Sequence, residues 1–306
     1  MKKIEVLGLQ TVPEIKTGDN LAQIIADCAK NEIGGLREKD IIVLTSKIIS
    51  KALGLTRRLS EVTPGRKALY ISKKTGKDPR WVQSIFDVGH QILAILPLKG
   101  IIKQQIMAAS KDTHCSDELI EHEQALFITK GKSGSIHTCD AGIDGSNHPG
   151  DTVSLLPEDP DKAARDIREQ IQRLCGMKVA VILADTEMVP FGTMDLAVGS
   201  SGIEPRSKMF GKKDLFGKPK FGGMDLVAYE LTAASALLFG QINAGIPAVV
   251  IRGYEYEISE TENISNTLTP QTDTGLSQII KETLLTTACA KGSITRLLLR
   301  IASWFI

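Results

Sequence analysis

The chain has 306 residues, a length that allows a substantial core in one large domain or two modest ones. With 37 basic and 36 acidic residues it carries no bulk charge that would attract nucleic acid or an anionic membrane, so phosphate binding would need a local site. Five widely spaced cysteines, the lack of an apolar signal segment and the lack of a run of about 20 apolar residues predict a cytoplasmic protein without a disulfide framework or a membrane span.

The N-terminal part alternates strand-like and helix-like segments. A strand is predicted over 4–9, and Asp19 or Asn20 is placed to cap a helix over 21–30. A further helix is expected to begin within 75–80. Its apolar side chains are expected to lie in the core rather than against a cofactor: Trp81, Val82, Ile85 and Phe86.

Between these segments, the apolar run 41–45 predicts a second, buried strand. Ser46, Lys47 and Lys51 follow it directly, and hydroxyl and ammonium groups at the end of a buried strand suit phosphate contacts. The alternative is that the two lysines, spaced i and i+4, lie solvated on a helix surface. The local sequence leaves both interpretations open.

A glycine-rich turn presents the first notable carboxylate. Gly142 and Gly145 flank Asp144, so the backbone can adopt positive φ and let a ligand approach closely. A carboxylate held in such a turn can take a divalent cation. The alternative role is that of an ordinary turn aspartate.

A helix, a strand and a second aspartate follow. Asp159 suits the N-cap of a helix that ends at Gly176, and the apolar run 178–183 predicts a buried strand. Asp185 and Thr186 would then lie at the carboxyl end of this strand, the usual side for ligands in layered α/β folds.

The next part combines a basic loop with a helix and a strand. An amphipathic helix is predicted over 225–239, with Gln241 just beyond its end, and a buried strand over 248–251. The loop 205–223 is expected to be solvated, with a lid or an acceptor clamp as the alternative. It carries six cations: Arg206, Lys208, Lys212, Lys213, Lys218 and Lys220.

Histidine-based catalysis finds no support in the sequence, because the five histidines have no evident carboxylate partner. The segment 90–123 has an apolar part and a polar part that contains His114, Cys115, His122 and Glu123. These four lack the paired spacing of zinc ligands, so the polar part is predicted to be an exposed loop. Residues 260–275 have the composition of a linker, and an apolar helical tail follows. The predicted domains are a catalytic region over 1–257 and a linker with a helical extension over 258–306.

Seven segments within residues 1–257 resemble, in order, the coenzyme F420-0:L-glutamate ligase family. They are TSKIISKALG, TGKDPR, GIDGSN, LLPEDPDKAARDIR, ILADT, AVGSSGI and FGQINAGIPAVVIRG. The resemblance implies an α/β fold with mixed α+β sheets in two lobes, and a homodimer. It also implies an acid–amino-acid ligase, in which GTP phosphorylates the carboxylate of a coenzyme precursor and the amine of L-glutamate displaces the phosphate to form an amide.

The resemblance also implies roles for individual residues. It carries the metal ligands onto Asp144, Asp185, Thr186 and Gln241, for Mg²⁺ or Mn²⁺, with K⁺ as a further candidate ion. Asp144, Asp185 and Lys51 are the expected catalytic residues. The expected nucleotide contacts are Pro13, Glu14, Ile15, Lys16, Ser46, Lys47, Lys51, Asn147, Phe239, Gly240, Gln241, Ile242, Asn243, Ala244, Gly245 and Ile246.

Two departures from the family pattern concern the acceptor side. Members usually continue after the second aspartate with Phe-Gly-Arg-Pro-Trp-Arg, whereas this chain has Glu187, Met188, Val189, Pro190, Phe191 and Gly192. An Asp-Tyr-Arg-Gly element is replaced by 206–209, and Lys218 stands for an arginine of different geometry. The acceptor is therefore open between an F420-0-type precursor and a pteroate or folate, and a nucleotide-binding homologue without catalysis is a further alternative.

Overall fold

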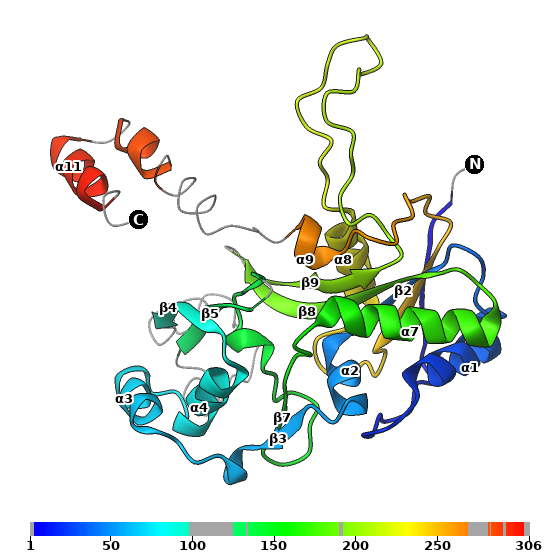
Figure 1. The fold of residues 1–306 in the computed structure, drawn as a ribbon, viewed down its shortest axis with the longest axis horizontal. Helices are drawn as coiled ribbons and strands as arrows, with labels where there is room; N and C mark the ends of the chain where they lie inside the picture. Colours follow the sequence, from blue (N-terminus) through cyan, green and yellow to red (C-terminus); the bar gives the residue numbers. More distant parts are fainter. Residues whose placement is uncertain are drawn as a thin grey trace, which may run out of the picture. The chain divides into compact units, whose positions relative to one another are not determined.

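The computed structural model describes residues 3–97, 125–132, 134–189, 192–268, 281, 283–289 and 292–302. The chain divides into two units, 1–268 and 269–306. In the second unit, helix α11 (Ser293–Ala302) has no buried residue. The larger part of the 90–123 segment and the last apolar residues, 304–306, lie outside the described residues. The first unit contains two layered lobes (Figure 1).

The first lobe is built on a five-stranded sheet of order β1-β10-β2-β8-β9. β2 and β8 are parallel, and the other neighbours are antiparallel. The strand bounds are β1 Glu5–Gly8, β2 Ile41–Thr45, β8 Ala180–Val189, β9 Gly192–Ser201 and β10 Ala248–Arg252. The paired central segments 41–44, 180–184 and 248–251 are apolar because both faces of the sheet are covered there.

Helices cover the two faces of this sheet (Figure 1). α1 (Leu21–Ile33) and α7 (Pro160–Cys175) pack with Ile42 and Leu44 of β2 on one face. α8 (Val227–Phe239) packs on the other face, in the cluster that holds the alternate residues Ile41 and Val43. The period of two along a strand thus divides one apolar run between two cores.

The helix ends follow local rules. Asn20 and Asp159 cap α1 and α7, with side chains that accept hydrogen bonds from the amides of Gln23 and Lys162. Gly176 ends α7 in the left-handed conformation, with φ of 71°. These boundaries agree with those predicted from the sequence.

The second lobe packs a small antiparallel sheet against two helices. The sheet contains β4 (Gln91–Pro97), β5 (Ala125–Lys130) and β6 (Ile136–His137). The helices are α3 (Arg66–Thr75) and α4 (Pro79–Val88). The helix start predicted within 75–80 is confirmed, since Asp78 caps α4 with Pro79 at its first position. The preceding helix α3, which ends at Thr75, was not predicted.

Short elements connect the lobes. α2 (Ser46–Ala52) follows β2 directly, and the ribbon of β3 (Thr56–Arg58) with β7 (Thr152–Ser154) runs beneath it. Two 3-10 turns, η1 (Leu59–Glu61) and η2 (Asp140–Gly142), complete the connection. The chain therefore passes between the lobes beside α2 and η2, which is where the candidate site lies.

The structure corrects the expected end of the strand over 178–183. β8 continues to Val189 as a hairpin with β9, a strand that was not predicted, so Asp185 and Thr186 lie within β8 rather than after it. They still lie just beyond the end of β2, whose last partner on β8 is Ala184. Asp185 and Thr186 therefore do lie beside the carboxyl end of a strand, as predicted, but the strand that ends there is β2 and not β8.

Residues 258–268 belong to the first unit and pack against the rest of it, so they do not form only a linker. The guanidinium of Arg168 donates to both carboxylate oxygens of Glu260 at 2.6 Å. Asp161 accepts hydrogen bonds from the amides of Ile264 and Ser265, at the start of α9 (Ile264–Thr267). The predicted boundary of the catalytic region at residue 257 stays a prediction.

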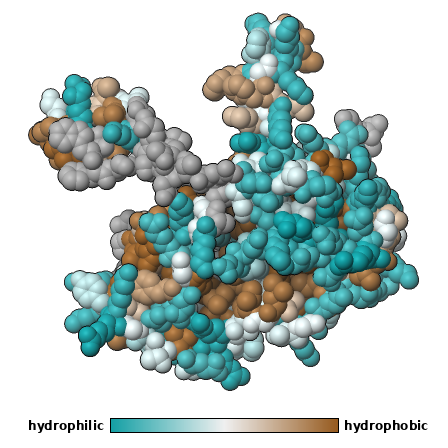
Figure 2. All heavy atoms as spheres, in the orientation of Figure 1, coloured by the Kyte–Doolittle hydropathy of each residue, from teal (hydrophilic) through white to brown (hydrophobic). Residues whose placement is uncertain are grey.

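The basic loop 205–223 extends from the first lobe as two antiparallel segments (Figure 1). Backbone hydrogen bonds join them, among them Met209 to Gly223 and Asp214 to Lys218. Its apolar side chains are mixed with the cations at its far end (Figure 2), and Leu215, Phe216 and Phe221 are almost fully exposed.

Candidate active site

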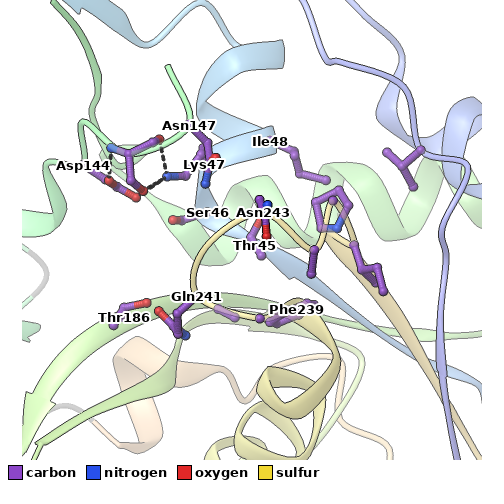
Figure 3. A pocket seen from close by; sticks show the side chains of 18 of the residues that line it. Thr45, Ser46, Lys47, Ile48, Asp144, Asn147, Thr186, Phe239, Gln241 and Asn243 are labelled. Atoms are coloured by element: carbon purple, nitrogen blue, oxygen red, sulfur yellow. Dashed lines mark hydrogen bonds and ion pairs between the residues drawn. The ribbon is translucent and has the colours of Figure 1, made fainter. Parts of the chain in front are cut away.

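A cavity of about 360 Å³ opens where β2 passes into α2 (Figure 3). It is lined by two continuous segments, 12–15 and 239–247, and by residues 45–48. All the predicted nucleotide and metal residues line it except Lys16, which is exposed. The remaining lining residues are Lys51, Asp144, Ser146, Asn147, Ala184, Asp185, Thr186 and Asp195.

The two lysines of α2 are turned into this cavity. Lys47 contacts Asp144 and also donates to the carbonyl and the hydroxyl of Ser146, both at 2.6 Å. Lys51 pairs with Glu14 and donates to the carbonyl of Asn147 at 3.1 Å. Their side chains are only 16% and 10% exposed, so the solvated alternative is wrong. Two partly buried ammonium groups suit an anionic ligand.

The loop that carries Asp144 is held by a buried network. Asp140, Ala141 and Gly142 all have positive φ, of 51°, 60° and 70°. Asp140 pairs with the buried Lys77 and accepts hydrogen bonds from the amide of Phe127 and the indole of Trp81, each at 3.0 Å. Left-handed backbone at non-glycine residues persists only where the surroundings compensate for it, as this network does.

Gly142 brings the loop against Asp185. A Cβ atom at this position would lie 2.1 Å from Leu156 Cδ1 and 3.2 Å from Asp185 Oδ2. The glycine is therefore required by space as well as by φ. Asp144 and Asp185, distant in sequence, consequently line the same cavity.

The electrostatics around Asp185 fit a cation. Burial raises the pKa of Asp185 well above its usual range, and the nearby charges of Glu187, Asp144 and Asp195 raise it further. The hydroxyl of Ser46 donates to Asp185 at 2.6 Å and opposes this shift. The ammonium of Lys47 already pairs with Asp144. The remaining carboxylates leave an excess of negative charge, which a divalent ion bound to their oxygens would neutralise.

Thr186 and Gln241 are brought together by a carboxylate that the sequence analysis missed. The buried Asp195 on β9 accepts hydrogen bonds from the hydroxyl of Thr186 at 2.7 Å and from the side-chain amide of Gln241 at 3.2 Å. Figure 3 shows Thr186 and Gln241 close to each other, across the cavity from Asp144 and Lys47. The available signal was a charged residue two positions before AVGSSGI, the segment that begins at Ala197.

A histidine with a carboxylate partner was also missed. His137 Nδ1 lies 3.1 Å from Glu187 Oε1, and both side chains are buried. The expectation that the histidines lack such a partner is therefore wrong. The two residues lie 50 positions apart and meet only because β6 approaches β8, so no local spacing could reveal the pair.

A second cavity, of about 780 Å³, adjoins the first. The second lobe contributes Lys77, Arg80 and Trp81 to its wall. Both cavities share five residues: Asp144, Ser146, Asp185, Thr186 and Gln241. The acidic pair thus lies at the junction of two binding spaces, an arrangement that allows a group to pass from a ligand in one to a ligand in the other.

The model of the F420-0:Gamma-glutamyl ligase family matches residues 10–253. The chain belongs to this family. A coenzyme F420:L-glutamate ligase of Methanosarcina mazei is 33% identical over 272 residues, covering 88% of this chain and 93% of the relative. Relatives of the same name are 34% identical in Methanothermobacter thermautotrophicus, with 83% and 90% covered, and 33% identical in Archaeoglobus fulgidus, with 82% and 88% covered.

Membership of the F420-0:gamma-glutamyl ligase family makes the protein a ligase and confirms the family inferred from the seven segments. The mixed α/β architecture with several sheets is also confirmed. In the described part of the chain, none of the helices has the length and apolar character to cross a membrane. The homodimer and the cytoplasmic location stay predictions.

Proposed function

We propose that the protein joins L-glutamate by an amide bond to the carboxylate of a coenzyme precursor, with GTP as the phosphoryl donor and Mg²⁺ or Mn²⁺ as the metal. The observation that carries the proposal is the position of Asp144 and Asp185 at the junction of two cavities. The names of the relatives support glutamate as the amine and an F420-type precursor as the acceptor.

The first cavity has the character of a nucleotide site. Lys47 and Lys51 provide positive charge, while the backbone of 239–247 forms an extended wall with the exposed amide side chains of Gln241 and Asn243. Ammonium groups act as point charges on phosphate oxygens, and amides donate directional hydrogen bonds to a base or ribose. We assign the triphosphate to the end of the cavity beside Lys47.

The metal role is assigned to the oxygen ligands of Asp144, Asp185, Thr186 and Gln241. All four line both cavities, and hard divalent cations prefer such oxygen donors. A cation bound there would offset the charge of the phosphate oxygens during transfer.

The second cavity is the proposed space for the acceptor. Its carboxylate would face the terminal phosphate across Asp185. Arg80 in the wall, which pairs with Asp78 but is 41% exposed, is the cation that an acidic ligand could reach. Transfer of the γ-phosphoryl group gives an acyl phosphate and GDP. The amine of L-glutamate then attacks the acyl carbon, the C–O bond breaks, and inorganic phosphate leaves.

The proposal is tested by incubating the full chain with GTP, L-glutamate, Mg²⁺ or Mn²⁺, and either an F420-0-type deazaflavin precursor or pteroate. We expect phosphate release and a product heavier by one glutamate residue only in the complete mixture. Release without glutamate would indicate a phosphatase. GTP binding without release with either acceptor would indicate a homologue without catalysis and would overturn the proposal.

A matched pair of variants separates the site from general effects of charge. Asp185→Asn is expected to lower turnover by about 100-fold or more, because a carboxylate at the point of phosphoryl transfer is lost. Asp166→Asn removes an exposed carboxylate of α7 that pairs with Lys162, and is expected to retain wild-type turnover. Sedimentation of the same samples measures whether the chain is a homodimer.

A further inference from the structure

A second group of metal-type ligands shares Asp185 with the Asp144–Asp185 pair, and its other two members, His137 and Glu187, have no role in the proposed function. His137 on β6 and Glu187 on β8 approach Asp185, and one ligand atom from each lies within 4.8 Å of the others. Asp185 and Glu187 are two positions apart on one strand, so their side chains point to the same face of the sheet. The group therefore combines one imidazole nitrogen with two carboxylates.

The spacing within this group fits one ion. His137 Nδ1 and Glu187 Oε1 are 3.1 Å apart. Ligands bound at about 2.1 Å in neighbouring positions of an octahedron are separated by about 3 Å. A small divalent ion can therefore bind both atoms with almost no movement of either side chain, and a small shift of Asp185 would complete three ligands.

The outer contacts hold both ligands in position. His137 Nε2 lies 3.0 Å from the hydroxyl of Ser135, so its second nitrogen is already engaged. Glu187 Oε2 accepts hydrogen bonds from the amide of Thr138 at 2.6 Å, from its hydroxyl at 2.7 Å, and from the amide of Cys139 at 3.1 Å. Partners of this kind orient histidine and carboxylate ligands in metal sites.

The local charge also favours a cation. The charges of Glu187, Asp144 and Asp195 all act on Asp185, and Lys47 is engaged with Asp144. Glu187 is the charged neighbour with the largest influence on Asp185. An ion between these two carboxylates would relieve their repulsion. Because an imidazole nitrogen takes part, a transition metal fits better than Mg²⁺, which prefers oxygen ligands.

We propose that His137, Asp185 and Glu187 hold a divalent transition-metal ion, with Mn²⁺ and Zn²⁺ as the candidates, in addition to the cation of the Asp144–Asp185 pair. This inference depends on the proposed function only in that both sites use Asp185 as a ligand. The ion would enter through the second cavity, where Asp185 is accessible.

The test counts ions without any substrate. The full chain is freed of metal with a chelator and titrated with Co²⁺, whose visible absorption reports its ligands, while equilibrium dialysis counts the bound ions. The wild type is expected to bind one equivalent more than His137→Gln or Glu187→Gln. His90→Gln is the matched control, because its ring stacks on His137 at 5.3 Å between centroids but lies outside the ligand group. Equal counts and equal spectra for the wild type and His137→Gln would overturn the proposal.

A second measurement does not depend on the folding of the His137 variant. Pulsed electron paramagnetic resonance of Mn²⁺ bound to the wild type should show coupling to a histidine nitrogen. The coupling should persist in His90→Gln and in His148→Gln, whose ring lies near Asp144. Absence of nitrogen coupling in the wild type would refute the site. Since neither measurement uses GTP, glutamate or an acceptor, this result is independent of whether the ligase assay succeeds.

Discussion

Substitution of Gly142 by alanine tests whether the loop of Asp144 is fitted against Asp185. The residue has φ of 70°, a conformation that costs an alanine about 1–2 kcal/mol. Its new Cβ would lie 2.1 Å from Leu156 Cδ1 and 2.5 Å from Leu156 Cγ, and overpacking of this kind costs about 1–3 kcal/mol. We therefore expect Gly142→Ala to lower the free energy of unfolding by about 2–5 kcal/mol in total.

The matched control is Gly176→Ala. Gly176 has φ of 71°, but nothing lies within 4 Å of the Cβ that alanine would add. Gly176→Ala should therefore lower the free energy of unfolding only by the cost of the left-handed backbone, about 1–2 kcal/mol. Urea unfolding of both variants measures the difference, expected at about 1–3 kcal/mol.

Turnover gives a second readout for the same pair of variants. Gly142→Ala should impair the ligase assay because the loop must move away from Asp185, whereas Gly176→Ala should not. Equal losses of stability, or full turnover in Gly142→Ala, would refute the argument that close packing aligns the two carboxylates.

Three further predictions concern charged groups. Lys47→Met should lower kcat/KM for GTP by about 100-fold, or about 2.7 kcal/mol, while Lys132→Met at an exposed ion pair should not; similar values for both would contradict the phosphate role. Lys77→Met should destabilise the fold by about 3–5 kcal/mol in urea unfolding, with recovery when Asp140→Asn is added, because the buried carboxylate otherwise loses its partner; no recovery would contradict this. Burial raises the pKa of Asp161 above its ordinary 3.8, so the folded state favours the protonated carboxyl group. The contribution of Asp161 to the free energy of unfolding is therefore greatest below pH 3.8 and is lost as the pH rises through the raised pKa. The stability difference between wild type and Asp161→Asn should fall over this range, and a constant difference would refute it.

Local patterns predicted much of the first lobe. The continuous apolar runs of β2 and β10 were recognised as buried strands because both faces of a covered sheet are apolar. The caps Asn20 and Asp159 and the stop at Gly176 depend on contacts within a few residues, which a linear pattern contains.

The errors occur where distant segments decide. The strand over 178–183 was expected to end early because Asp185 and Thr186 are polar, yet pairing with β9 continues it to Val189. Lys47 and Lys51 have the spacing of an exposed helix face, and only the approach of Asp144 and Glu14 shows that they are turned inward.

The sequence by itself determined the buried strands β2 and β10, the caps of α1 and α7 and the set of motifs that indicates a ligase, because these depend on periodicity, caps and short segments. The tertiary structure alone decided that two cavities meet at Asp144 and Asp185, that Asp195 joins Thr186 to Gln241, and that His137 meets Glu187. Each of these depends on backbones that pack together from different lobes or strands. Such contacts form when the whole chain buries its apolar surface, and no stretch of residues encodes them locally.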